Sequence, residues 1–258
     1  MLLNNLIFVS SPLDQFEVVS IFGFKAPILG YVNFTLTNLG LYSLVVLFLV
    51  TSLHYFANNE KRLIPNKWSI GLECSFVSLH QMVREQIGSS YEVYLPFVYS
   101  VFFFVIIANL TGNVPYNYTL TTSVITSIGF SFTIFVGVTI LGVFVKKWKF
   151  FASFIPEGTP LFLVPLLVCI EFISYIARAF SLGIRLFANM VAGHTLLKIL
   201  STFLFKMFTS SIILSIVTLI PFAIFVALIG LELGVSIIQA YVLTILTCSY
   251  IKDAIELH

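Results

Sequence analysis

The sequence contains few charged residues. Lysine and arginine together number 13 and aspartate and glutamate 11, so charged side chains make up 9% of the 258 residues and hydrophobic ones 59%. A soluble domain needs a polar surface, and this composition cannot cover one, which excludes a soluble protein or a separate soluble domain. The net charge of +2, without a basic cluster interleaved with aromatic residues, gives no sign of a nucleic-acid partner.

Paired cysteines are also lacking. The three cysteines, Cys74, Cys169 and Cys248, are far apart and show no C-x-x-C spacing, which argues against a thiol metal site or a redox pair. The four histidines form no pair within one helical segment, which argues against haem. We therefore predict no metal and no cofactor. The chain starts with M-L-L-N-N-L-I-F-V-S and so lacks the basic region that begins a secretory signal.

Long apolar runs are what the sequence does contain. Runs of about 20 residues match the hydrocarbon thickness of a bilayer. They do not alternate with a period of two, so they predict helices rather than barrel strands. We predict an all-α polytopic membrane protein that forms a single integral membrane domain, 1–258. Its parts are a vertical N-terminal span at 36–56, an interfacial amphipathic helix at 68–87, a helical hairpin at 95–145 and a long hairpin at 161–255.

The last two apolar segments are too long for upright spans. A helix of 45 residues is about 68 Å long, against a hydrocarbon core of about 30 Å. Each segment therefore either breaks into two vertical spans or lies steeply tilted. Because neither offers a polar turn near its middle, we favour two long tilted helices in an antiparallel hairpin, joined by a short turn near residues 209–211.

Basic residues predict the orientation of the spans. Under this topology one side of the membrane receives Lys61, Arg62, Lys67, Arg84, Lys146, Lys147, Lys149 and Lys252, and the other receives Lys25, Lys198 and Lys206. The more basic side faces the cytoplasm or its equivalent. The N-terminus is then expected outside and the C-terminus inside.

Ionisable residues inside the long hairpin are the main candidates for function, because charge within a membrane is costly. Glu171, Arg178 and Arg185 are seven residues apart on the first helix. On the second helix, Glu232, Gln239 and Asp253 are separated by multiples of seven. Seven residues return to nearly the same helical face, so each helix carries one polar stripe.

The two stripes also face each other in register. In an antiparallel hairpin, the residue numbers of any two opposed residues add up to the same total. This total is the same for Arg185 with Gln239 as for Glu171 with Asp253, and that of His194 with Glu232 differs by only two. The arginine thus lies between an acidic inner end and a His–Glu outer end, each about 13 to 21 Å from it along the helix. His194 is offset from Arg185 by about half a helical turn, so the two polar regions need not form one continuous proton path.

Several of these residues also fit simpler roles. Arg178 fits a structural partner of Glu171 or of a lipid phosphate, and Gln239 fits a plain hydrogen bond between helices. His194 alone fits a satisfied core histidine. Glu171 and Asp253 lie near a helix end, where a carboxylate can simply be solvated.

Three segments resemble a known family. They are P-E-G-T-P-L-F-L-V-P-L-L-V-C-I-E, Y-I-A-R-A-F-S-L-G-I-R-L-F-A-N-M-V-A-G-H and I-I-Q-A-Y-V-L-T-I-L-T-C-S-Y-I-K-D-A-I, and they look like subunit a of F-type ATP synthases, closest to the mitochondrial, fungal form. S-P-L-D-Q-F-E-V resembles the mature N-terminus of the fungal members, so residues 1–10 are expected to be a removable leader.

The resemblance implies a stator subunit of the mitochondrial inner membrane, with its N-terminus towards the intermembrane space and its C-terminus towards the matrix. Two nearly horizontal helices would lie against a ring of c subunits, beside other Fo stator subunits. It implies proton transport without catalytic chemistry in this chain, which would serve as one part of an ATP-synthesising complex. The implied roles are the essential arginine at Arg185, the outer half-channel at His194 and Glu232, the inner one at Glu171 and Asp253, and Asn189 and Gln239 near the arginine.

Three other functions compete with this one. A self-contained ion channel or secondary transporter would need a pore or inverted repeats, and the two halves show no internal repeat. A haem-carrying redox subunit is disfavoured by the histidine pattern. In a purely structural membrane subunit, replacement of Arg185 would affect assembly alone.

Overall fold

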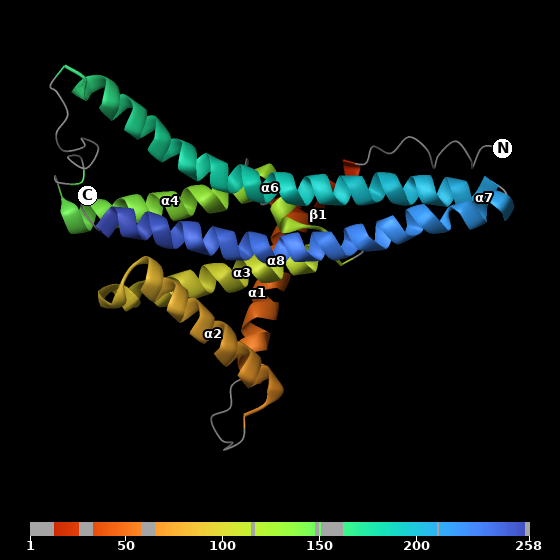
Figure 1. Cartoon of the computed structure of the whole chain (residues 1–258), viewed down its shortest axis with the longest axis horizontal. Coiled ribbons are helices and arrows are strands. Elements are labelled where there is room, and N and C mark those ends of the chain that lie inside the picture. Colours follow the sequence, from red (N-terminus) through yellow and green to blue (C-terminus); the bar gives the residue numbers. More distant parts are fainter. Residues whose placement is uncertain are drawn as a thin grey trace.

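The computed structural model describes residues 13–25, 33–57, 65–114, 117–147, 150, 162–210 and 212–255. The expected leader at 1–10 lies outside the described residues, as do Lys61, Arg62 and Lys149. The helices and strands are η1 Asp14–Phe16, β1 Ser20–Lys25, β2 Asn33–Thr37, α1 Asn38–Ala57, α2 Lys67–Gln86, η2 Ser89–Tyr94, α3 Leu95–Gly112, η3 Leu120–Thr122, α4 Val124–Lys146, α6 Val164–Ser210, α7 Ile212–Val217 and α8 Leu219–Ile255 (Figure 1).

Within the described part of the chain, five helical segments are long and apolar enough to cross a membrane. They are Asn38–Ala57, Glu92–Gly112, Val124–Lys146, Val164–Ser210 and Ser215–Ile255. Helix α2 is not among them, because its charged side chains, such as Glu73 and Arg84, interrupt the apolar positions. The predicted class, an all-α polytopic membrane protein, is confirmed.

Helices α6 and α8 form the longest part of the molecule. Helix α6 has 47 residues and α8 has 37, and they run antiparallel, with the short α7 at the turn (Figure 1). Helix α6 continues unbroken through Ser181–Arg185, and α8 continues through Pro221 and Gly230. At 1.5 Å per residue, α6 is about 70 Å long, more than twice the hydrocarbon thickness. The first part of α6 bends away from α8 (Figure 1).

Helices α3 and α4 pack beside this pair. The largest hydrophobic core joins α3, α4, α6 and α8 through residues that include Val98, Val138, Leu182 and Leu243. Helices α4 and α6 approach closely at Gly183, where an added Cβ would lie 2.9 Å from the Cα of Ile128. Small residues let the backbones of membrane helices approach this closely. Such packing matters because lipid provides no hydrophobic force between helices, so van der Waals contact holds them together.

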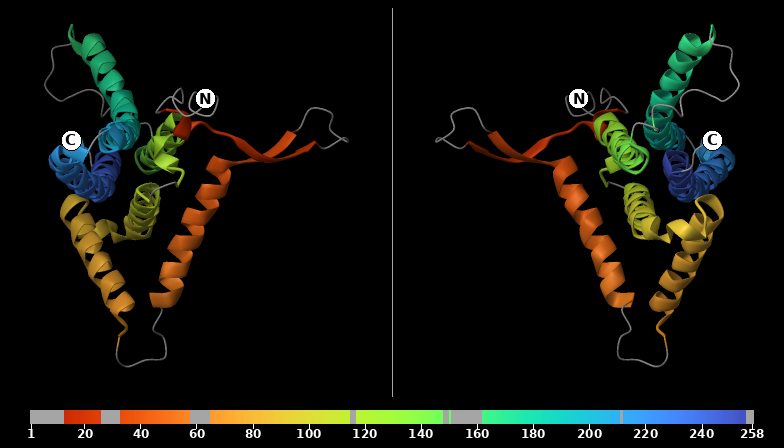
Figure 2. Two further views of the ribbon diagram at one scale, coloured as in Figure 1. Left: turned by 90° about the vertical axis from the view of Figure 1, so that its right-hand side faces the viewer. Right: turned by 90° about the vertical axis from the view of Figure 1, so that its left-hand side faces the viewer.

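A β-hairpin precedes α1 and was not expected from the sequence. Strands β1 and β2 pair antiparallel and project sideways from the helices, while α1 and α2 form a V below the bundle (Figure 2). The side chain of Asn38 fixes the hairpin to the start of α1. Its Nδ2 donates to the carbonyl of Glu17, and its Oδ1 accepts from the backbone N–H groups of Val19 and Leu39.

Candidate functional site

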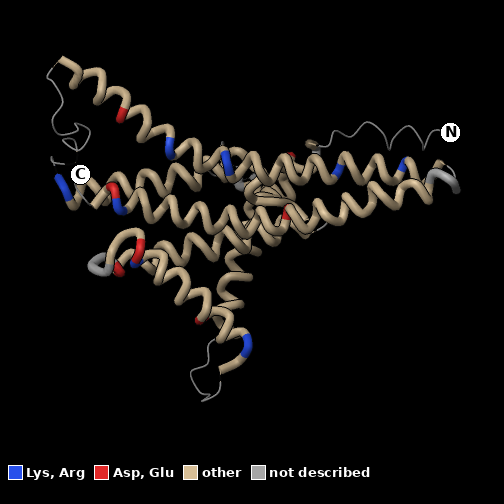
Figure 3. Tube along the Cα trace, in the orientation of Figure 1, with Lys and Arg blue, Asp and Glu red and all other residues tan. Residues whose placement is uncertain are grey.

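The polar residues that the sequence singled out lie on α6 and α8. Charged positions recur along α6, and acidic residues of α8 lie near its middle and near its C-terminal end (Figure 3). The structure groups them into an outer pair, an inner cluster and a central arginine.

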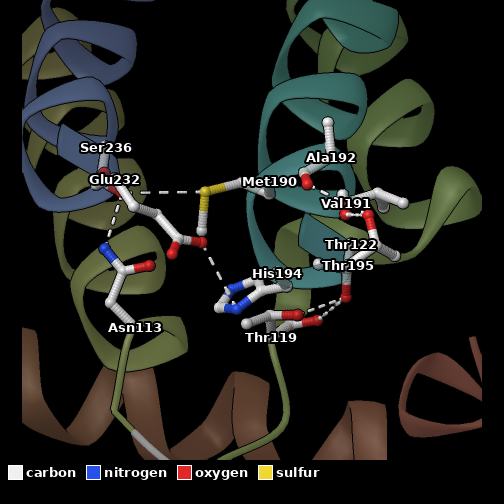
Figure 4. A network of polar contacts seen from close by, with 10 residues as sticks. All are labelled: Asn113, Thr119, Thr122, Met190, Val191, Ala192, His194, Thr195, Glu232 and Ser236. Atoms are coloured by element: carbon white, nitrogen blue, oxygen red, sulfur yellow. Dashed lines mark hydrogen bonds and ion pairs between the residues drawn. The ribbon is translucent and has the colours of Figure 1, made fainter. Parts of the chain in front are cut away.

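The outer pair consists of His194 on α6 and Glu232 on α8. The Nδ1 atom of His194 lies 3.4 Å from Oε1 of Glu232, and the side chains are only 17% and 9% exposed (Figure 4). At this distance a protonated His194 forms an ion pair with Glu232, but the contact lacks hydrogen-bond geometry, because Glu232 Oε1 has no hydrogen-bond partner. The other ring nitrogen, His194 Nε2, is also buried without a hydrogen-bond partner. Gly193 makes room for the carboxylate, because a Cβ there would lie 2.8 Å from Glu232 Oε1.

The end of α3 adds polar groups to this region that sequence reasoning missed. Asn113 donates from Nδ2 to Ser236 Oγ at 2.7 Å, and Ser236 donates to the carbonyl of Glu232 at 2.8 Å (Figure 4). Asn109, fully buried, donates to the carbonyl of Ser236 at 3.3 Å. The available signal was the presence of two amides, four residues apart, at the end of an apolar run.

The same region contains further buried polar atoms without a hydrogen-bond partner. They are Asn109 Oδ1, Asn113 Oδ1, Tyr118 Oη and Thr121 Oγ1. Buried polar atoms of this kind are rare in proteins and are normally satisfied by ordered water. The surroundings of His194 and Glu232 are therefore polar over several helices.

The inner cluster is organised around Arg178. Its Nη1 lies 3.0 Å from Asp253 Oδ2, and its Nη2 lies 3.6 Å from Glu171 Oε1. The three side chains are about two-fifths exposed. The sequence left two simple roles open for Arg178, as a partner of Glu171 or of a lipid phosphate. The structure shows its contact with Glu171 and a second contact with Asp253. Glu171 and Asp253 are thus brought together through the arginine between them.

Arg185 lies on an exposed face of α6, opposite in character to its buried neighbours Leu182 and Leu186. Gln239 and Asn189 are half-buried. Among the described residues, no hydrogen bond or ion pair links Arg185 with either amide. Because Arg185 is exposed, a group outside the described part of the chain can reach its guanidinium.

A resident metal finds no site in the described residues. No group of three or more histidine, cysteine, aspartate or glutamate side chains is placed to hold an ion there.

The fold and these groups define a polytopic helical membrane protein with ionisable side chains paired inside its longest hairpin, an arrangement typical of ion-translocating proteins. The sequence model of one family, described as ATP synthase A chain, matches residues 40–252, and the chain belongs to this family.

Curated relatives agree over nearly the whole chain. The chain is 60% identical over 250 residues to ATP synthase subunit a of Mycosarcoma maydis, covering 97% of this chain and 98% of that protein. It is 46% identical over 252 residues to ATP synthase subunit a of Emericella nidulans and 43% identical over 253 residues to that of Chondrus crispus, with 97% of this chain and 98% of each relative covered. The resemblance found in the sequence is confirmed, and a self-contained channel or transporter is not favoured.

Proposed function

We propose that this chain is the stator subunit that passes protons to and from a ring of c subunits in a mitochondrial F-type ATP synthase. Its fungal relatives support the location in the inner membrane. The basic residues support an N-terminus towards the intermembrane space and a C-terminus in the matrix. Other Fo stator subunits would surround it.

Protons enter from the outer side through the region of His194 and Glu232. A histidine beside a carboxylate can accept and release protons near neutral pH, which suits it to relay them. The amides of Asn109 and Asn113, whose Oδ1 atoms are buried, and the hydroxyl groups nearby can hold water molecules between these groups and the surface. The relay ends on a carboxyl group of a c subunit, which becomes neutral and can then move through lipid at low cost.

Arg185 separates uptake from release. After nearly a full turn of the ring, the rotor carboxyl meets the guanidinium, which stabilises its ionised form. The proton leaves through the inner cluster of Glu171, Arg178 and Asp253. The fixed positive charge also repels protons, which prevents a direct leak between the two polar regions.

The observation that carries this proposal is the position of Arg185. It lies on the exposed face of α6 between two polar regions, without a hydrogen bond or ion pair to the described residues of its own chain. Each proton moved through 100 mV yields about 2.3 kcal/mol, so several protons are needed for each ATP.

The test is proton transport by the complete ATP synthase containing Arg185→Ala, assembled to normal levels in membrane vesicles. We expect ATP-driven proton pumping to be lost. The control is Arg84→Ala, which removes an exposed arginine of α2. Coupled transport at the wild-type rate without passive leak would overturn the proposal, and an effect on assembly alone would favour a structural subunit.

A further inference from the structure

Lys146 is a buried cation that the proposed proton path does not use. It is the last residue of α4 and is 7% exposed. Within the described residues it and Glu232 are the charged side chains that fall among the buried ones. Burial of an ammonium group is costly unless hydrogen bonds compensate it. Its Nζ atom donates to the backbone carbonyl of Asp253 at 3.1 Å.

The carbonyl that Lys146 binds belongs to the end of α8. The last four carbonyl groups of a helix have no N–H partner within the helix. Asp253 lies in the last described turn of α8, which extends to Ile255. A cation at this end also interacts favourably with the helix dipole. Lys146 therefore stabilises the last turn of α8 by both hydrogen bonding and charge.

The end of α4 is shaped for this contact. One turn before Lys146, Gly142 lies against α8, where an added Cβ would come within 3.4 Å of the Cβ of Ala254 and 2.8 Å of the Phe150 ring. Immediately after Lys146, the backbone of Lys147 has φ 51°, which ends the helix. Close packing and an abrupt helix end together place the ammonium group at the last turn of α8.

Asp253 is consequently held from two sides. Its carboxylate binds Arg178 at 3.0 Å, and its carbonyl binds Lys146 at 3.1 Å. Arg178 is anchored in turn by Glu171 and accepts a hydrogen bond on its own carbonyl from Tyr250 at 3.4 Å. A shift of the last turn of α8 would move the carboxylate away from the guanidinium.

We propose that Lys146 is a positioning residue for proton release on the inner side. It fixes the last turn of α8 so that the carboxylate of Asp253 stays at Arg178, and it does not carry the proton itself. This role rests on the proposed function, in which Asp253 belongs to the release path.

The experiment compares four variants in the complete ATP synthase: Lys146→Met, Lys146→Arg, Asp253→Asn and the double variant Lys146→Met/Asp253→Asn. ATP-driven proton pumping is measured per assembled complex. We expect Lys146→Met to lower the rate about tenfold and Lys146→Arg, which keeps a cation with N–H donors, to retain most of it. Because Lys146 acts through Asp253, Lys146→Met should cause no further loss when Asp253→Asn is present.

The matched control is Lys147→Gly. It removes a neighbouring positive charge at a backbone conformation that glycine adopts readily, so pumping should stay at the wild-type rate. A loss that is equal in the presence and absence of Asp253→Asn, or a loss confined to assembly, would overturn the role of Lys146. The role of Lys146 would also be overturned if Lys146→Met pumped at the wild-type rate, or if Lys146→Arg lost as much pumping as Lys146→Met. If Asp253→Asn alone leaves pumping unchanged, the release path itself is wrong and the role of Lys146 falls with it.

Discussion

His194 and Glu232 meet across α6 and α8, with Nδ1 and Oε1 3.4 Å apart. One helical turn away, Ser236 of α8 reaches Met190 of α6, with Oγ and Sδ 3.8 Å apart. The two contacts have the same index sum, so both follow from one antiparallel register. The register brings a histidine of one long helix to a carboxylate of the other within a mostly buried region.

Exchanging the two residues tests whether the pair acts as a unit. His194→Glu alone places two acids together, and Glu232→His alone places two imidazoles together, so each should lower proton pumping at least about tenfold. The double variant His194→Glu/Glu232→His restores one acid and one imidazole and should recover much of the rate. Pumping by the assembled complex is the measurement. A double variant no better than the worse single variant would contradict the paired role.

Gly193→Ala tests the position of the Glu232 carboxylate. The new methyl group would lie 2.8 Å from Oε1 and 3.1 Å from Cδ, so the flexible side chain must move away from His194. We expect normal assembly with pumping lowered by about three- to tenfold, because proton relays depend on close geometry. Gly234→Ala is the control, since a Cβ there meets nothing within 4 Å. Equal rates for the two variants would show that the carboxylate position is unimportant.

Arg178 variants test the inner cluster. Arg178→Met leaves the carboxylates of Glu171 and Asp253 without their shared cation. Because these groups are about two-fifths exposed, the cost in stability should be about 1 kcal/mol or less. Proton pumping by Arg178→Met should fall more clearly, by about three- to tenfold. The pumping rate of Arg178→Lys should lie between those of the wild type and Arg178→Met, because one ammonium group cannot bind two carboxylates in the manner of a guanidinium.

The measurement is pumping per assembled complex, with Arg84→Met as a control for loss of an arginine. The inner cluster would have no part in transport if Arg178→Met pumped at the wild-type rate. A loss limited to assembly would instead assign Arg178 a structural role.

The sequence predicted the outer contact better than the inner one. Equal spacing on both helices is enough to place His194 opposite Glu232 where α6 and α8 lie side by side. It predicts Glu171 opposite Asp253, yet Asp253 binds Arg178, two turns further along α6. The reason is the bend that carries the first part of α6 away from α8 (Figure 1). Pairing residues by the sum of their residue numbers assumes that both helices are straight, so it cannot predict such a bend.

The sequence pattern involved only α6 and α8, so it could not predict what other helices contribute to the polar site. Asn109 and Asn113 reach Ser236 because α3 packs on α8; their spacing of four residues indicates a polar face on α3 but not the helix that this face contacts. Lys146 reads from the sequence as an interfacial lysine that sets orientation, whereas the structure buries it. The β1–β2 hairpin was missed although β2, N-F-T-L-T, alternates polar and apolar residues, because its last two residues also begin the apolar run at 36–56.

Gly183→Ala tests the packing that presents Arg185. An added Cβ would lie 2.9 Å from the Cα of Ile128 and 3.0 Å from the carbonyl of Ser127, and backbone atoms cannot move aside as a side chain can. Helices α4 and α6 must therefore separate, at a cost of about 1–3 kcal/mol. The gain in helix propensity from glycine to alanine, about 1 kcal/mol, offsets only part of it. We expect a lower midpoint of thermal unfolding in detergent and slower pumping, because Arg185 shifts with its helix.

The control is Gly137→Ala on α4, where a Cβ meets nothing within 4 Å and stability should rise slightly. If Gly183→Ala were as stable as Gly137→Ala, the close contact of α4 and α6 would not be what holds Arg185 in place.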